Sequence, residues 1–131
     1  MIILFSLSRM ARKESIMETT NVINLTPHTV TVFDSDTIVL SIESSGVARV
    51  SATTNVVGQI RVGDVIVPRT HTVYGTVEGL PAPTPGTVYI VSGMIISALA
   101  SQGIHRDDLF TPGLQVRDEQ GRVIGCRSLD N

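Results

Sequence analysis

From Val22 onward, apolar and polar residues alternate in short runs that glycine, proline, aspartate and serine interrupt. A period of two is typical of strands, because successive side chains point to opposite faces of a strand. The runs with this pattern are VINL (22–25), HTVTVFD (28–34) and TIVLSI (37–42). The sequence therefore predicts a mainly β fold, bordering on α+β, built as a small antiparallel barrel or sandwich.

Turn residues inside apolar runs predict two further hairpins. The segment VVGQIRVGDVIVPRT (56–70) turns at Gly63-Asp64, and the last hairpin turns at residues 118–121. The run TVYIVS (87–92) is almost continuously apolar, which is typical of a central strand that is buried on both faces.

One segment, GMIISALASQG (93–103), has helical spacing. Its apolar residues fall on one stripe, Ser92 stands at the N-cap position, and Gly103 is suited to the C-terminal stop. We expect one short helix near residues 93–102.

The length of 131 residues is that of one domain, and we assign residues 21–131 to a single β-rich domain. Residues 1–20 are assigned no fold. The codons for residues 12–14 (Arg-Lys-Glu) can form a purine-rich run that resembles a bacterial ribosome-binding site, with Met17 as the start codon behind it. Either the native protein begins at Met17 and residues 1–16 are a mis-assigned start, or residues 1–20 are a flexible tail.

Charge and composition exclude several partners. The formal net charge is −2, and Lys13 is the only lysine. Such a chain is poorly suited to a nucleic-acid backbone, so we expect no nucleic-acid polymer as a partner. No apolar run reaches the roughly 20 residues of a membrane-spanning helix, so no membrane partner is expected either. The single cysteine, Cys126, fits a reducing compartment, and we expect a cytoplasmic protein.

Five polar residues are predicted to lie beside turns or strand ends, where binding sites gather on β scaffolds. These candidate ligand-binding residues are His28, Arg49, Ser92, Arg106 and Asp108. Each also has a plain structural alternative. His28 can simply end a strand, Ser92 can cap the helix, and Arg106 can pair with a neighbouring aspartate.

No catalytic set, metal site or cofactor site is predicted. The three histidines, His28, His71 and His105, lack metal-ligand spacing. Ser92 stands between a strand and a helix, as a nucleophile does in the G-x-S-x-G elbow, but the text here is IVSGMI.

Several segments resemble those of one family of small bacterial and phage proteins, found mainly in actinobacteria and their phages. They are NLTPH (24–28), SSGVARV (44–50), VYGTVEGLPAPTPGTVYIVS (73–92), RDDLFTPG (106–113) and VRDEQGRVIGCRSL (116–129). Such proteins open with an NLTPH-type strand and close with a GRVIGC-type strand. The resemblance covers nearly everything after residue 20 and so supports a start at Met17. It implies no activity and no catalytic residue.

Three functions are compatible with these observations. The first is a non-enzymatic, homo-oligomeric protein that binds a small anionic or nucleotide-like ligand, possible in a phage–host setting. The second is a structural or assembly component, of a virion or another oligomer, whose apolar strand edges pair between copies. The third is a small hydrolase that uses His28 or Ser92, with Asp108 as the orienting residue.

Overall fold

This computed structural model describes residues 16, 18–19 and 21–131, and within them it contains ten strands and one helix. In chain order they are β1 (Asn21–Asn24), β2 (Val30–Asp34), β3 (Thr37–Ile42), β4 (Ala52–Val62), β5 (Val65–Tyr74), β6 (Thr87–Ile90), α2 (Gly93–Ser101), β7 (Leu109–Pro112), β8 (Gln115–Arg117), β9 (Val123–Cys126) and β10 (Leu129–Asp130). The mainly β class and the single short helix are confirmed. The expected start at Met17, and the expected tail apart from residues 16, 18 and 19, lie outside the described residues.

The first sheet has the strand order β1-β6-β7-β10. Its β1–β6 and β6–β7 pairs are parallel, and its β7–β10 pair is antiparallel. The parallel β6–β7 pair follows from α2, which connects the two strands, because parallel neighbours need a crossover connection.

The second sheet has the order β3-β2-β9-β8 and contains two antiparallel hairpins, joined by a parallel contact between β2 and β9. No sheet of the described residues closes into a barrel, so the sandwich alternative holds. Four strand pairs are antiparallel and three are parallel, so the pairing is mostly antiparallel, as the sequence predicted. The parallel pairs join distant segments, such as Asn21 with Thr87, and local alternation does not specify such pairings.

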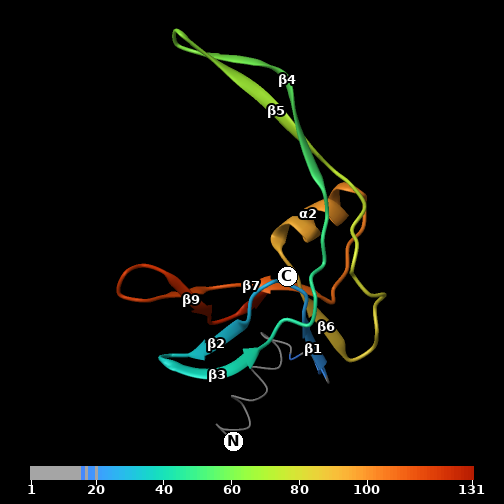
Figure 1. Cartoon of the computed structure of the whole chain (residues 1–131), viewed down its shortest axis with the longest axis vertical. Helices are drawn as coiled ribbons and strands as arrows, with labels where there is room; N and C mark the ends of the chain where they lie inside the picture. Colours follow the sequence, from blue (N-terminus) through green and yellow to red (C-terminus); the bar gives the residue numbers. More distant parts are fainter. Residues whose placement is uncertain (1–15, 17, 20) are drawn as a thin grey trace, which may run out of the picture.

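β6 is buried on both faces, as its continuous apolar run predicted. Tyr89 faces the cluster that contains Ile95 and Leu99 of α2, whereas Ile90 packs with Val30 and Cys126 of the second sheet. We call α2 and the two four-stranded sheets together the body. It has three layers, with the first sheet between α2 and the second sheet (Figure 1).

β4 and β5 form a separate two-stranded sheet that projects away from this body (Figure 1). We call this hairpin, residues 52–74, the arm. Its strands meet at Gly63-Asp64, the turn that the sequence predicted. Gly63 has a φ of 60°, a left-handed conformation that glycine adopts without the steric cost of a side chain.

Candidate functional site

A buried asparagine shapes the turn that carries His28. Asn24 is fully buried, and its side-chain amide donates hydrogen bonds to the carbonyl oxygens of His28 (2.7 Å) and Ile42 (2.9 Å). Its Oδ1 accepts hydrogen bonds from the backbone N–H (3.0 Å) and the hydroxyl (2.6 Å) of Thr26. These bonds fix the backbone of the Thr-Pro-His turn against β3, while the side chain of His28 stays exposed.

Ser92 lies where β6 ends and α2 begins. It occupies the N-cap position in an extended conformation, with φ −71° and ψ 155°. Its hydroxyl makes no capping hydrogen bond, although its carbonyl oxygen accepts a hydrogen bond from Ile95 N–H at 3.1 Å. The predicted N-cap position is therefore correct, and the side chain is exposed at the helix start.

His28 and Ser92 line the same groove, which has a volume of about 660 Å³. The groove lies between the start of β2, the β6–α2 junction and strands β7, β8 and β9. Threonines, Gln115 and apolar side chains form the rest of its lining, and none of its described lining residues is aspartate, glutamate, lysine or arginine. Two of the five predicted site residues thus meet, in a groove without a carboxylate or a guanidinium.

Arg106 and Asp108 lie outside this groove and bind each other. Arg106 donates from Nε to Oδ1 (2.9 Å) and from Nη2 to Oδ2 (2.7 Å) of Asp108, and the two side chains are only 14% and 17% exposed. These hydrogen bonds lower the pKa of Asp108 and raise the pKa of Arg106. The Arg106 guanidinium also lies 5.9 Å from the ring centroid of Tyr89. The pair thus stabilises the start of β7 beside β6, which is the structural alternative weighed for Arg106.

Arg49 lies at the root of the arm, where its backbone forms a bridge with Glu78. Arg49 N–H donates to the Glu78 carbonyl and Glu78 N–H donates to the Arg49 carbonyl, both at 2.8 Å. Arg49 lines a separate shallow hollow with Glu78, Ser51 and Thr76. It does not line the groove that His28 and Ser92 share.

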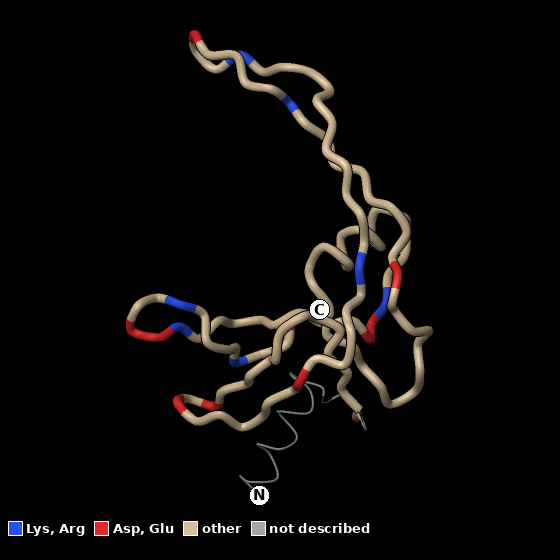
Figure 2. The backbone as a smooth tube through the Cα atoms, viewed as in Figure 1, with Lys and Arg blue, Asp and Glu red and all other residues tan. Residues whose placement is uncertain are grey.

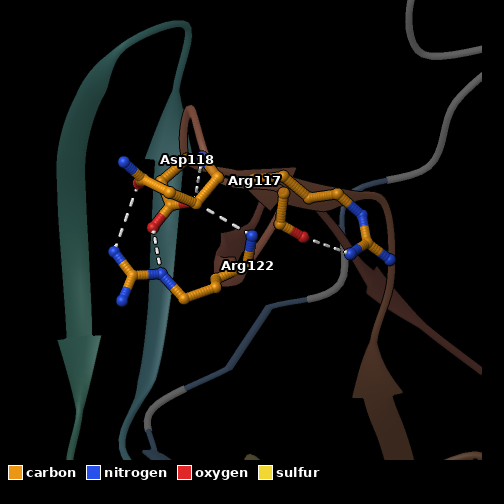
Figure 3. Close-up of polar contacts among 5 residues, drawn as sticks. Arg117, Asp118 and Arg122 are labelled. Atoms are coloured by element: carbon orange, nitrogen blue, oxygen red, sulfur yellow. Dashed lines mark hydrogen bonds and ion pairs between the residues drawn. The ribbon is translucent and has the colours of Figure 1, made fainter.

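The charged side chains of the loop between β8 and β9 form hydrogen bonds within the loop itself (Figure 3). Asp118 accepts hydrogen bonds from the backbone N–H groups of Gln120 and Arg122 and from Nε of Arg122 (2.8 Å). The backbone hydrogen bond from Arg122 is the main cause that lowers the pKa of Asp118. Arg117 donates to the Gly121 carbonyl (2.6 Å). These contacts explain a well-formed loop and do not point to a ligand.

The arm is the second candidate surface, because both of its faces are exposed to solvent. Cross-strand partners share a face, and the pairs Val62–Val65 and Ile60–Val67 alternate with Arg61–Ile66. Four β-branched side chains near the tip therefore share one face, and they are 41–61% exposed. We call these four residues the tip patch: Ile60, Val62, Val65 and Val67.

Comparisons with protein-family models, with curated proteins and with solved structures find no match to this chain. The resemblance to actinobacterial and phage proteins therefore stays a prediction. The described residues contain no group of three or more histidine, cysteine, aspartate or glutamate side chains that could hold a metal ion. No helix among them is long and apolar enough to cross a membrane.

The sequence predicted that the arm is a hairpin, but it did not predict that the hairpin projects and exposes an apolar candidate binding surface. One signal was available in its length. β4 has 11 residues and β5 has 10, about twice the usual strand length, and 11 residues of strand span about 35 Å. A strand of that length extends beyond a body whose other strands have two to six residues, and it must then expose its apolar side chains.

Proposed function

We propose that the protein is a structural or assembly component that associates with further copies of itself through the arm. The observation that carries this proposal is the tip patch, four β-branched residues on one face of a two-stranded ribbon that nothing else in the described chain covers. Contiguous exposed apolar surface of this kind marks interaction sites in soluble proteins.

The physical argument concerns what such a ribbon gains from a partner. A two-stranded hairpin is marginally stable in water, and a third strand or a packed face is needed to make it robust. Completing the burial of a half-exposed valine or isoleucine contributes roughly 1 kcal/mol. The tip patch would therefore contribute roughly 4 kcal/mol to association if a partner covered all four residues.

Two parts of this proposal rest on the sequence. The proposed setting, a bacterial or phage assembly such as a virion, is taken from the resemblance to actinobacterial and phage proteins. The buried, unpaired Cys126 fits a reducing compartment and therefore assembly in the cytoplasm.

Mass measurement by light scattering after size-exclusion chromatography tests the proposal. We expect the wild-type mass to be a multiple of 14.1 kDa. The double variant Val62→Thr/Val65→Thr keeps the shape and β propensity of both side chains but makes them polar. Its dissociation constant should rise by at least about tenfold, which corresponds to about 1.4 kcal/mol.

The matched control is Val123→Thr, the same substitution at a β9 residue that is 50% exposed. It should leave the mass unchanged. A wild-type protein that stays monomeric at high concentration, or a control that weakens assembly as much as the tip variant does, would reject the arm as the site of association.

The groove favours a second candidate function, the binding of a small anionic or nucleotide-like ligand. His28 and Ser92, two residues that the sequence selected independently, line one groove of about 660 Å³. This volume lies within the range of roughly 300–1,000 Å³ that is usual for small-molecule sites. An N–H group of the His28 imidazole and the first N–H groups of α2 would supply the anion contacts.

Titration calorimetry against inorganic phosphate and nucleoside mono-, di- and triphosphates tests this second candidate. We expect one of them to bind, and His28→Gln to weaken that binding by about tenfold through the loss of the imidazole hydrogen bond to the ligand. His71→Gln, on the arm, is the matched control and should bind as the wild type does. Uniformly flat titrations, or equal losses in both variants, would argue against the groove as an anion site.

A further inference from the structure

One sheet edge in the body shares the exposed apolar character of the arm. β3 is the edge strand of the second sheet, and β2 is its one hydrogen-bonded neighbour strand among the described residues. Its side chains Ile38, Val39 and Leu40 are 58%, 57% and 47% exposed. Ile38 and Leu40 pair with Phe33 and Val32 of β2, and the register shift between these two pairs leaves Val39 as an extra residue without a partner in β2. All three side chains offer apolar surface at this edge. An open apolar edge is a template for another strand.

The β2–β3 hairpin and the arm carry opposite charges. Residues 30–43 contain Asp34, Asp36 and Glu43 with no lysine or arginine, a net charge of −3. Arg127 approaches the turn of this hairpin and donates a hydrogen bond to the Ser35 carbonyl at 3.0 Å, which offsets one of these charges. The acidic residues lie at the ends of the hairpin (Figure 2).

The arm has a net charge of +1, from Arg61 and Arg69 against Asp64. None of these three residues takes part in the ion pairs of the described residues, which are His105–Asp107, Arg106–Asp108 and Arg122–Asp118. Arg61 and Arg69 are exposed to solvent, so they are available to an acidic partner surface. Figure 2 shows the basic positions of the arm on the part that projects from the rest of the chain.

One edge of the arm is closed and the other is open. Pro68 of β5 pairs with Gln59 of β4, and proline has no N–H to donate. The pair therefore cannot exchange hydrogen bonds, and the nitrogen of Pro68 faces the outer edge of β5, which it blocks against a third strand. β4 contains no proline, so a third strand can join the arm at the β4 edge.

The arginines of the arm lie toward this open edge. Arg61 belongs to β4 itself. Arg69 belongs to β5, but its guanidinium reaches across the ribbon, because a Cβ atom built on Gly58 of β4 would lie 3.3 Å from its Nη2. The glycine at position 58 leaves the room for this crossing. Both positive charges are thus presented along β4.

We infer that β4 of one copy adds to the β3 edge of a second copy and places Arg61 and Arg69 against the acidic β2–β3 hairpin. This inference rests on the proposed function and names the receiving surface. Two different surfaces meet in such a contact, so the interface is heterologous. Repeated contacts of this kind produce a closed ring or an open filament instead of a two-fold dimer.

A charge-reversal experiment with full-length chains tests this inference. One chain carries Arg61→Glu/Arg69→Glu and the other carries Asp34→Arg/Asp36→Arg. Each reversed chain alone should assemble at least about tenfold more weakly than the wild type, because like charges would meet at every contact. An equimolar mixture should recover assembly, since the acidic arm of the first chain fits the basic hairpin of the second and the reverse pairing matches as well.

Asp107→Arg is the control, since this side chain is 91% exposed and belongs to the connection between α2 and β7, outside both the arm and the β2–β3 hairpin. Circular dichroism shows that each chain is folded before mixing, and Asp36→Arg alone replaces the double variant if the double variant is not. Reversed hairpins that assemble as the wild type does, or mixtures that do not recover, would overturn the inference that the arm binds the β2–β3 hairpin. If Val62→Thr/Val65→Thr still weakened assembly, the proposed function would stand without it.

Discussion

β6 and the arm are built from the same kind of residue and end in opposite environments. β6 is buried on both faces between α2 and the second sheet, whereas the arm is exposed on both faces. Valine and isoleucine are frequent in both regions, because their branched side chains favour extended backbone. The comparison teaches that an apolar strand pattern specifies a strand and a need for cover. Whether the same copy provides that cover depends on contacts between residues far apart in the sequence.

The largest expected effect separates an isoleucine of the body from one of the arm. Ile90 is fully buried between the two sheets, and Ile60 is 49% exposed. We expect Ile90→Ala to lower the free energy of unfolding by about 3–4 kcal/mol, through lost burial and a residual cavity. Ile60→Ala should cost less than about 1 kcal/mol in the monomer, since solvent already fills one side of it.

Urea denaturation, followed by circular dichroism at a protein concentration low enough to prevent association, measures both free energies. At high concentration, the Ile60 variant should lose additional stability, because association stabilises the folded state. Equal losses for the two variants at low concentration would contradict the comparison, since they would make the arm part of the monomer's own core.

The local part of this difference could be predicted from the sequence. The turn at Gly63-Asp64, the turn at residues 118–121 and the helix near residues 93–102 follow from short-range chemistry, and the structure confirms them. The parallel pairing of β1 with β6 and the exposure of the arm do not follow, because they depend on which distant segments meet.

For the candidate site, too, the sequence predicted local positions but not which residues lie close together in the fold. His28 and Ser92 share a groove, since His28 lies just before β2 and Ser92 lies between β6 and α2. Arg106 and Asp108 do not line the groove. They are two residues apart in the chain, and their side chains form hydrogen bonds with each other. Arg49 lies at the root of the arm, a position that only the long hairpin creates. Their ligand-binding role stays a prediction.

The next effect compares two asparagines. The side chain of Asn24 is fully buried and makes three hydrogen bonds within the turn that carries His28 and a fourth to Ile42 of β3, whereas Asn55 is exposed on the arm. Asn24→Ala removes the side-chain partner of the Thr26 N–H and of the Ile42 carbonyl, while the Thr26 hydroxyl keeps its 3.0 Å bond to the His28 carbonyl. We expect the variant to lower the free energy of unfolding by about 2 kcal/mol. Asn55→Ala should change it by less than about 0.5 kcal/mol.

Thermal denaturation at low protein concentration distinguishes these two variants. The Asn24 variant should also release the His28 turn, which faster amide hydrogen exchange at Thr26 would report. A stable Asn24 variant with unchanged exchange would show that packing alone orders this turn.

The smallest expected effect on stability concerns the ion pair of the body. Arg106 is paired with Asp108, whereas the arginines of the arm form no ion pair among the described residues. The hydrogen bonds from Arg106 lower the pKa of Asp108. A carboxylate with a lowered folded pKa adds stability above its unfolded pKa of about 3.9, and that stability is lost as the pH falls through the folded pKa. We therefore expect Asp108→Asn to cost about 1 kcal/mol at neutral pH and to reduce the loss of stability below about pH 4.

Unfolding measured from neutral pH down through the acid range, with Asp107→Asn as the matched control, checks this prediction. Asp107 is 91% exposed, so its variant should follow the wild-type curve. The Asp108 variant should differ most from the wild type at neutral pH, and the two curves should converge in acid. If instead the Asp107 and Asp108 variants had the same curve, the ion pair would contribute nothing to the junction of β6 and β7. The charged side chains of the body would then add no more stability than the solvent-exposed arginines of the arm, and the two regions would differ in packing alone.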